Sequence, residues 1–305
     1  MTVNLAVSIG KLKLKNPVMV GSGTFGYAEE FGDFVDLKNL GAIVTKTITI
    51  KPRSGNPSPR TCETPAGMLN SIGLENPGID KFISEKLTEL LKIGPPIIVS
   101  ISSIGDPKEF ITLAARLDKI KAVAAIELNL SCPNIKEHSR LISQNPKFTH
   151  AVVKMTRKVT KKTLIAKLSP NVTDIVEIAK AAEDGGADAV SLINTLGGMS
   201  IDVKSRTPKI AMITGGLSGP AIRPVAVCMV WETYRKIKIP IIGMGGIMDT
   251  QNALEFFMAG ATAVSIGTGN FINPGLTMEI IRGLESYLSK NKLSGINQLT
   301  GSVKT

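Results

Sequence analysis

Residues 163–193 read TLIAKLSPNVTDIVEIAKAAEDGGADAVSLI and contain one complete strand–helix–strand repeat. Residues 163–168 are apolar or β-branched apart from Lys167, and residues 187–193 are mostly apolar, as in strands buried on both faces. The segment between them carries apolar residues at helical spacing and stops at Gly185-Gly186. The stretch therefore predicts a unit of the kind that builds parallel sheets.

The same alternation runs through the whole chain of 305 residues. Eight short runs rich in apolar and β-branched residues alternate with helical patterns, and they span 17–22, 41–46, 96–101, 124–130, 163–168, 187–193, 239–244 and 262–267. Eight such units in a chain of this length favour a closed (β/α)8 barrel over an open, doubly wound sheet. No linker or shift in composition divides the chain, so we expect one domain over 1–305.

Helix ends and connections add detail to this barrel. Asp80 and Asp249 are candidate N-caps, Asp106-Pro107 opens another helix with proline at its first position, and Thr173 precedes a fourth. Residues 3–14 alternate in short pieces around Gly10, which predicts a hairpin that closes the bottom of the barrel. Two connections, 47–79 and 194–219, are much longer than the usual 2–6 residues, and both follow strands. We therefore expect them over the face where barrels build their active sites.

Composition restricts the class of protein. The net charge of +11 is compatible with an anionic partner, but the basic residues are scattered and aromatic residues make up only 4%. Neither a membrane span nor a secretory signal is recognisable, so we expect a cytoplasmic protein that binds no nucleic acid and no membrane. Three cysteines and two histidines are too few and too dispersed for a disulfide framework or a metal site.

Polar and glycine-rich clusters stand at the carboxyl ends of the predicted strands, which converge on one mouth in a barrel. The clusters at 243–246 and 267–269 follow the seventh and eighth strands, where the backbone N–H groups of glycine-rich turns commonly hold a phosphate. The alternative is that these glycines serve turn geometry alone. No G-x-G-x-x-G follows the first strand, which disfavours a dinucleotide of the Rossmann type.

Individual side chains at this mouth are candidates for chemistry. Lys167 lies inside a buried strand, where its ammonium would stabilise negative charge on a bound ring, although it could instead extend to the barrel rim. Cys132 follows the fourth strand and is equally well interpreted as a general base or as an inert buried thiol. We interpret Cys62 and Cys228 as inert. Four asparagines could read the edge of a pyrimidine or serve as turn residues: Asn70, Asn129, Asn134 and Asn194.

Two segments of the chain carry specific motifs: residues 63–78, ETPAGMLNSIGLENPG, and residues 129–134, NLSCPN. They resemble the substrate loop and the motif around the catalytic cysteine of the class 1 dihydroorotate dehydrogenases. Further matches are GGLSG at 215–219, GMGGI at 243–247 and GTGNF at 267–271. The resemblance covers essentially the whole chain in order; the first two motifs are specific, whereas the glycine motifs occur in other FMN barrels.

This resemblance implies FMN as the cofactor and oxidation of dihydroorotate to orotate in pyrimidine biosynthesis. Cys132 would be the base that removes the C5 proton, while hydride leaves C6 for the flavin. The resemblance implies an orotate shell made of Lys46, Asn70, Ser71, Ile72, Gly73, Leu74, Asn129, Asn134, Asn194 and Thr195. It implies an FMN shell made of Ser22, Lys46, Thr47, Ser100, Asn129, Lys167, Ile193, Gly219, Gly245, Gly246, Gly267 and Thr268.

The details are closer to the NAD-linked subtype, which implies a partner subunit that carries FAD and an iron–sulfur cluster. A homodimer, and a heterotetramer with that partner, are the expected assemblies. Thr47 and Ser100 depart from the glycine and asparagine common at those positions in the family. Two alternatives stay open: a related FMN barrel that acts on another dihydropyrimidine, such as dihydrouracil, and a non-catalytic barrel that binds a phosphorylated ligand.

Overall fold

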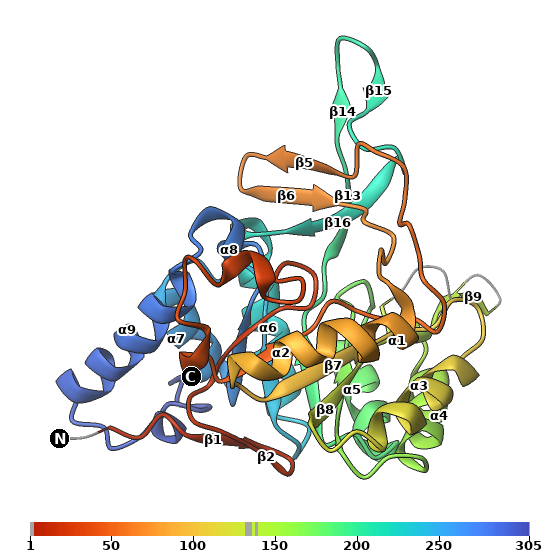
Figure 1. Cartoon of the computed structure of the whole chain (residues 1–305). Helices are drawn as coiled ribbons and strands as arrows, with labels where there is room; N and C mark the ends of the chain where they lie inside the picture. Colours follow the sequence, from red (N-terminus) through yellow and green to blue (C-terminus); the bar gives the residue numbers. More distant parts are fainter. Residues whose placement is uncertain (1–2, 132–135, 138–139, 305) are drawn as a thin grey trace.

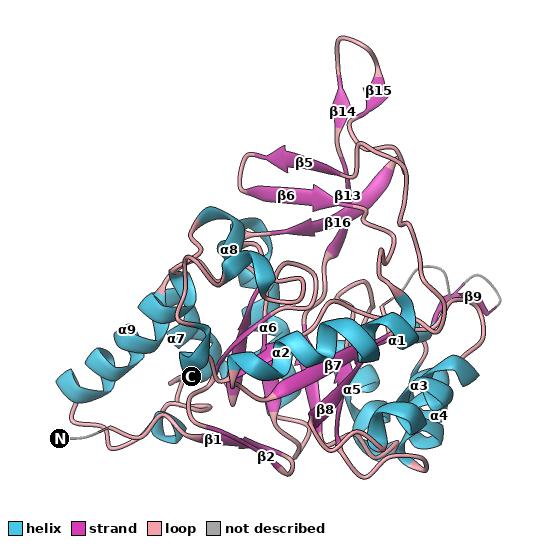
Figure 2. Ribbon diagram, in the orientation of Figure 1, coloured by secondary structure: helices cyan, strands magenta, loops and turns pink. Residues whose placement is uncertain are grey.

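The computed structural model describes residues 3–131, 136–137 and 140–304. Its centre is a closed barrel of eight parallel strands in the order β11-β12-β17-β18-β3-β4-β7-β8 (Figures 1 and 2). These strands are β3 (Val18–Val20), β4 (Ala42–Val44), β7 (Ile97–Ile101), β8 (Val123–Asn129), β11 (Thr163–Lys167), β12 (Ala189–Leu192), β17 (Ile241–Gly243) and β18 (Ala263–Ile266). Each lies within or overlaps one of the eight predicted runs, which confirms the predicted (β/α)8 architecture.

The barrel closes where β18 pairs in parallel with β3, so that Val264 lies opposite Val18. Its strands are buried almost throughout, and each is covered by helices on its outer side. This two-sided burial explains why the strands read as nearly continuous apolar runs rather than as an alternating pattern. Because all eight strands run the same way, their carboxyl ends face a single mouth.

The helices of the outer layer pack their apolar faces against the barrel. The longer ones are α2 (Leu87–Ile93), α3 (Lys108–Asp118), α4 (Pro146–Arg157), α5 (Ile175–Asp184), α6 (Arg223–Tyr234), α7 (Thr250–Ala259) and α9 (Leu276–Lys290). Two one-turn helices are α1 (Gly78–Lys81) and α8 (Gly269–Ile272), and a π-helical segment, η3 (Phe82–Lys86), joins α1 to α2. Short 3-10 helices are η1 (Glu29–Phe31), η2 (Leu37–Asn39), η4 (Ile142–Gln144), η5 (Pro220–Ile222) and η6 (Ile296–Gln298).

The predicted helix starts were right at one position and shifted at the others. Asp249 caps α7 by accepting a hydrogen bond of 2.7 Å from the Asn252 N–H, as expected. Asp80 lies instead inside the first turn of α1, because the Asn76 side chain already accepts the Gly78 N–H at 2.9 Å. Pro107 is the N-cap of α3 rather than its first helical residue.

The helix after β11 also begins one residue later than its predicted start. The cap of α5 is Asp174, which accepts a hydrogen bond of 2.7 Å from the Val176 N–H, and not Thr173. An ionised carboxylate next to free N–H groups at a helix start is also favoured by the helix dipole, which explains why the aspartate rather than the threonine takes this place.

The predicted hairpin at the bottom of the barrel is present. β1 (Val7–Ile9) and β2 (Leu12–Leu14) pair in an antiparallel arrangement around Gly10. The Lys11 N–H donates to the Thr163 hydroxyl at 3.2 Å, which ties the turn to the first residue of β11. The hairpin therefore covers the end of the barrel opposite the mouth.

The two long connections are not irregular loops, and here the sequence-based expectation was incomplete. Together they form a four-stranded sheet in the order β13-β16-β6-β5, which lies above the barrel (Figure 1). The first connection contributes β5 (Thr61–Thr64) and β6 (Gly67–Asn70); the second contributes β13 (Leu196–Met199) and β16 (Thr214–Ser218). A small hairpin of β14 (Ile201–Asp202) and β15 (Thr207–Pro208) projects beyond it, and β9 (Lys136–Glu137) pairs with β10 (Arg140–Leu141) in the connection after β8.

Asp188 should be important for stability at the bottom of the barrel. Its Oδ2 accepts a hydrogen bond from Arg157 Nη1 and another from the Leu164 backbone N–H, both at 2.8 Å. Asp188→Ala leaves both donors without this acceptor, so we expect it to lower the free energy of unfolding by about 2 kcal/mol in urea titrations. Asp184→Ala, an exposed position at the end of α5 with the same change of charge, should stay within about 0.5 kcal/mol. Equal losses from the two substitutions would contradict this role.

Candidate active site

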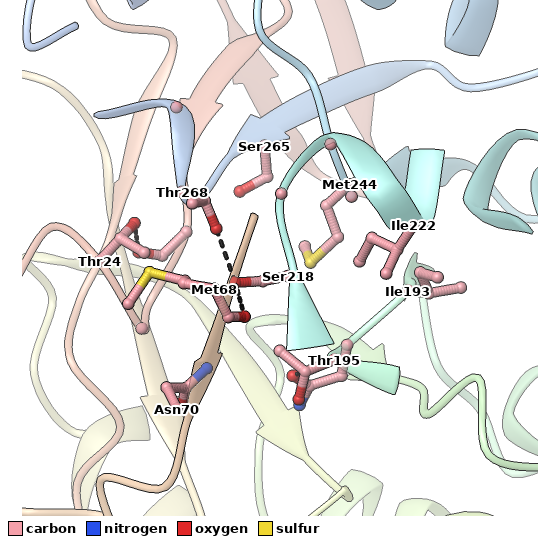
Figure 3. Close-up of a pocket in the computed structure, with 18 of the residues that line it drawn as sticks. Thr24, Met68, Asn70, Ile193, Thr195, Ser218, Ile222, Met244, Ser265 and Thr268 are labelled. Carbon is pink, nitrogen blue, oxygen red and sulfur yellow. Dashed lines mark hydrogen bonds between the residues drawn. The ribbon is translucent and has the colours of Figure 1, made fainter. Parts of the chain in front are cut away.

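A pocket opens at the mouth of the barrel, between the carboxyl ends of the strands and the four-stranded sheet (Figure 3). Its wall combines turns that follow barrel strands with side chains of β6 and β16. The lining residues are Gly21, Gly23, Thr24, Thr61, Met68, Asn70, Ile72, Lys167, Ile193, Asn194, Thr195, Ser218, Gly219, Ile222, Met244, Gly245, Gly246, Ile247, Ser265, Gly267, Thr268, Gly269 and Phe271. The pocket thus lies on the face where (β/α)8 barrels carry out chemistry.

Many residues assigned from the resemblance meet in this wall. Of the expected orotate shell, it contains Asn70, Ile72, Asn194 and Thr195. Of the expected FMN shell, it contains Lys167, Ile193, Gly219, Gly245, Gly246, Gly267 and Thr268.

Lys167 is the cation of the pocket wall. It is the last residue of β11, its side chain is only 6% exposed, and its Nζ lies 3.4 Å from the Ser22 hydroxyl. The alternative that this lysine extends to the barrel rim is therefore wrong, because the side chain stays inside the barrel. Ser22 does not line the pocket itself, but this contact brings it next to a residue that does.

A chain of polar side chains extends the site below the pocket wall. Asn194 Nδ2 donates to Asn129 Oδ1 at 3.4 Å, and Asn129 Nδ2 donates to the Thr47 hydroxyl at 3.4 Å. The Thr47 and Ser100 hydroxyls lie 2.9 Å apart. Thr47 and Ser100, which we expect from the resemblance to depart from the family pattern, are therefore hydrogen-bonded to each other. Asn129 connects them to Asn194 in the pocket wall.

Four other expected residues lie away from the lining. Ser71 accepts a hydrogen bond from Asn56, the Gly73 carbonyl accepts one from Arg53, and the Leu74 carbonyl accepts one from Asn76. These contacts hold residues 71–74 against their own connection, apart from Ile72, whose side chain reaches the wall. Lys46 is half-buried, and its backbone N–H bonds the Gly26 carbonyl.

Cys132 and Asn134 lie outside the described residues. Asn129 is the last residue of β8 and stands three positions before Cys132 in the sequence. Of the other cysteines, Cys62 lies on β5 and is partly exposed. Cys228 is exposed on α6, where desolvation of the thiol and the nearby Glu232 carboxylate raise its pKa.

Several lining residues were missed by the sequence analysis. Met68 and Ser218 reach the pocket from the sheet above it, where the Thr268 hydroxyl donates to the Ser218 hydroxyl at 2.8 Å (Figure 3). Ser265 points inward from β18, and its buried hydroxyl has no hydrogen-bond partner among the described residues. All three had a usable signal: Met68 and Ser218 stand in the motifs at 63–78 and 215–219, and Ser265 stands two residues before Gly267 on a strand with period two.

Two glycines at the mouth differ in whether a side chain would fit at their positions. Gly246 has a φ of +74°, and a Cβ there would lie 2.7 Å from the Gly219 carbonyl oxygen. A Cβ at Gly267 would meet no heavy atom within 4 Å, so this turn faces open space in the pocket. Gly246 is therefore required by the geometry of its turn, whereas Gly267 leaves room for a ligand.

The same substitution at the two glycines should separate these roles. Gly246→Ala forces a side chain into a left-handed conformation and a steric clash, so we expect unfolding free energy to fall by about 2 kcal/mol or more. Gly267→Ala should change it by less than about 0.5 kcal/mol. Urea denaturation of both variants measures this, and a large loss at Gly267 would show that its turn needs glycine for structure.

These features define a (β/α)8 barrel with a ligand pocket at its catalytic face, and comparison with known proteins identifies the family. The family model described as dihydroorotate dehydrogenase matches residues 4–288, and the chain belongs to this family. The chain is 53% identical over 300 residues to the dihydroorotate dehydrogenase B (NAD(+)), catalytic subunit, of Trichlorobacter lovleyi, covering 98% of each chain. It is 51% identical to the protein of that name from Geotalea uraniireducens and 52% identical to that from Thermoanaerobacter sp., with 99% of each chain covered.

No helix within the described residues is long and apolar enough to cross a membrane.

Proposed function

We propose that this chain oxidises dihydroorotate to orotate in pyrimidine biosynthesis, as a catalytic subunit with FMN as its cofactor. The observation that carries this proposal is the pocket itself: a buried lysine, amide side chains and open glycine turns meet at the catalytic face of a barrel in a member of this family. The names of relatives at about half identity over the full chain support the same activity.

The residues at the mouth fit FMN. Gly267 and Gly23 face open space, where a phosphate and a ring system can approach the backbone closely. The unpaired Ser265 hydroxyl offers a buried polar contact, and Lys167 offers a positive charge that is hardly hydrated. When bound, FMN supplies the acceptor for hydride.

The remaining chemistry falls to side chains of this chain. Cys132, which follows Asn129 and the polar network, acts as the general base that takes the proton from C5 of dihydroorotate, while hydride leaves C6. Lys167 stabilises the negative charge that develops across the mouth during the reaction. Asn70, Asn194 and Thr195 orient the substrate through its alternating N–H and C=O groups, since an amide can both donate and accept.

The other assigned residues complete the proposed shells. Lys46 and the segment 71–74 bind the substrate carboxylate in this proposal. In this structure, the Ser71 hydroxyl accepts a hydrogen bond from Asn56 and the Gly73 carbonyl accepts one from Arg53. Asn129 and Asn134 complete the substrate contacts. Thr47, Ser100 and Ser22 support the cofactor from beneath the pocket wall, and Ile193 packs against it.

Electrons leave through a second protein in this proposal. The relatives are named as catalytic subunits of NAD(+)-linked enzymes, which implies that each works with another subunit. We propose a partner that carries FAD and a 2Fe–2S cluster, assembled with a homodimer of this chain in the cytoplasm. Co-purification of the tagged chain with an iron–sulfur flavoprotein from its native host is the direct check.

Anaerobic mixing with candidate substrates tests the proposed reaction. The FMN-loaded protein should lose its absorbance near 450 nm with dihydroorotate and keep it with dihydrouracil, because only dihydroorotate offers a carboxylate to the substrate shell. Bleaching by dihydrouracil alone would assign the barrel to another dihydropyrimidine. A protein that takes up no FMN would instead support a barrel that binds a different phosphorylated ligand without catalysis.

Cys132→Ser tests the proposed base. A serine hydroxyl is a far weaker base than a cysteine thiolate, so we expect a loss of most of the activity near pH 7, roughly a hundredfold or more, with partial recovery at high pH. The measurement is the rate of flavin reduction by dihydroorotate between pH 6 and 10. Cys228→Ser, at an exposed position on α6, is the matched control and should match the wild type. A Cys132→Ser profile identical to that of the control would remove Cys132 from the mechanism.

A further inference from the structure

The interior of the barrel holds two opposite charges. Among the buried side chains of the described residues, only Glu127 and Lys167 are charged, with exposed fractions of 2% and 6%. Transfer of a charged group into a protein interior is costly unless an opposite charge or several hydrogen bonds compensate it. The proposed mechanism uses Lys167 but gives Glu127 no part, so the burial of this carboxylate needs its own explanation.

The strand register puts the two residues close together. β8 and β11 are neighbours in which Glu127 lies opposite Ile165, and Asn129 lies opposite Lys167. Side chains two residues apart on a strand point the same way, so Glu127 and Lys167 share the inner face of the barrel. They are diagonal neighbours, with Lys167 one step nearer the mouth, and such positions are about 7–8 Å apart, within reach of long side chains.

Ser191 connects the two charges. It lies opposite Lys167 in the pairing of β11 with β12, and its hydroxyl donates to Glu127 Oε2 at 3.3 Å. The other carboxylate oxygen, Glu127 Oε1, is buried and has no hydrogen-bond partner among the described residues. On the other side, the Lys167 ammonium donates a hydrogen bond to the Ser22 hydroxyl at 3.4 Å. Hydrogen bonds therefore compensate each charge only in part, and the opposite charge one step away compensates the rest.

We infer that Glu127 is the counter-charge of Lys167 and that it sets the reduction potential of the bound cofactor. This inference rests on the proposed function, because it assumes that FMN lies over Lys167. Lys167 favours the reduced, negatively charged flavin, and a carboxylate behind it offsets part of that positive charge. Glu127 is thus a tuning residue that acts through the field at the pocket floor and does not touch the substrate.

The sign and size of the effect follow from electrostatics. Removal of a negative charge below the cofactor makes electron uptake more favourable, so the midpoint potential should rise. At separations of about 10 Å and an effective dielectric constant of about 20 or more, one charge changes the reduction equilibrium roughly fivefold to fifteenfold. For a two-electron couple this corresponds to a rise of about 20 to 35 mV.

Glu127→Gln in the FMN-loaded protein tests the inference, because glutamine keeps the shape of the side chain and removes its charge. The potential is measured by anaerobic equilibration with reference dyes, without dihydroorotate. We expect a higher potential in Glu127→Gln, and a lower one in Lys167→Met. An unchanged potential in a folded, FMN-loaded Glu127→Gln variant would overturn the inference.

Ser191→Ala is the matched control, because it removes the hydrogen bond to Glu127 but keeps both charges. Its potential should stay close to that of the wild type; a shift as large as that of Glu127→Gln would show that the hydrogen bond, and not the charge, matters. If Glu127→Gln does not fold, Glu127→Asp keeps the charge one methylene shorter and should restore both folding and the wild-type potential. Failure of the wild-type protein to bind FMN would overturn the proposed function together with this inference, whereas normal FMN reduction with no shift in Glu127→Gln overturns the inference alone.

Discussion

Closure of the parallel sheet is the constraint on which the rest of this structure depends. Once β18 pairs with β3, all eight strands point the same way around a ring, and residues distant in sequence reach one mouth. Lys167 of β11, Ile193 after β12 and Gly267 after β18 share a pocket wall for this reason alone. The covering helices stabilise the ring, but the ladder decides which side chains can meet.

The barrel was predictable from sequence because its strands are buried on both faces and because α2, α5 and α7 end at glycines. The sheet above the mouth was not, because the segments TCET, GMLN, LGGM and TGGLS are short, rich in glycine and polar residues, and have little strand propensity. What makes them strands is mutual pairing across about 150 residues of chain, as between Met68 and Ser218, which no local pattern reveals. The resemblance assigned residues 70–74 to the site as a group, whereas only Asn70 and Ile72 of them line the pocket.

The sequence identified polar side chains at the mouth as candidates. It could not predict how polar side chains are arranged below the mouth. From the resemblance, Thr47 and Ser100 are each expected to depart from the family pattern, and in this barrel their hydroxyls are hydrogen-bonded to each other. Glu127 drew no attention in the sequence, because a single glutamate in an apolar run has no distinctive pattern. Glu127 becomes a candidate only in the structure, where the register of β8 and β11 places it beside Lys167, the one other buried charge of the described chain.

The sheet that joins the two long connections has a thermodynamic consequence for ligand binding. A connection of some thirty residues without partners would have to be ordered when a ligand arrives, and each ordered residue costs about 1–2 kcal/mol of conformational entropy. The ladder between β6 and β16 orders both connections within the folding reaction instead. Binding free energy can then appear as affinity and orientation of the ligand, rather than being spent on fixing the walls around it.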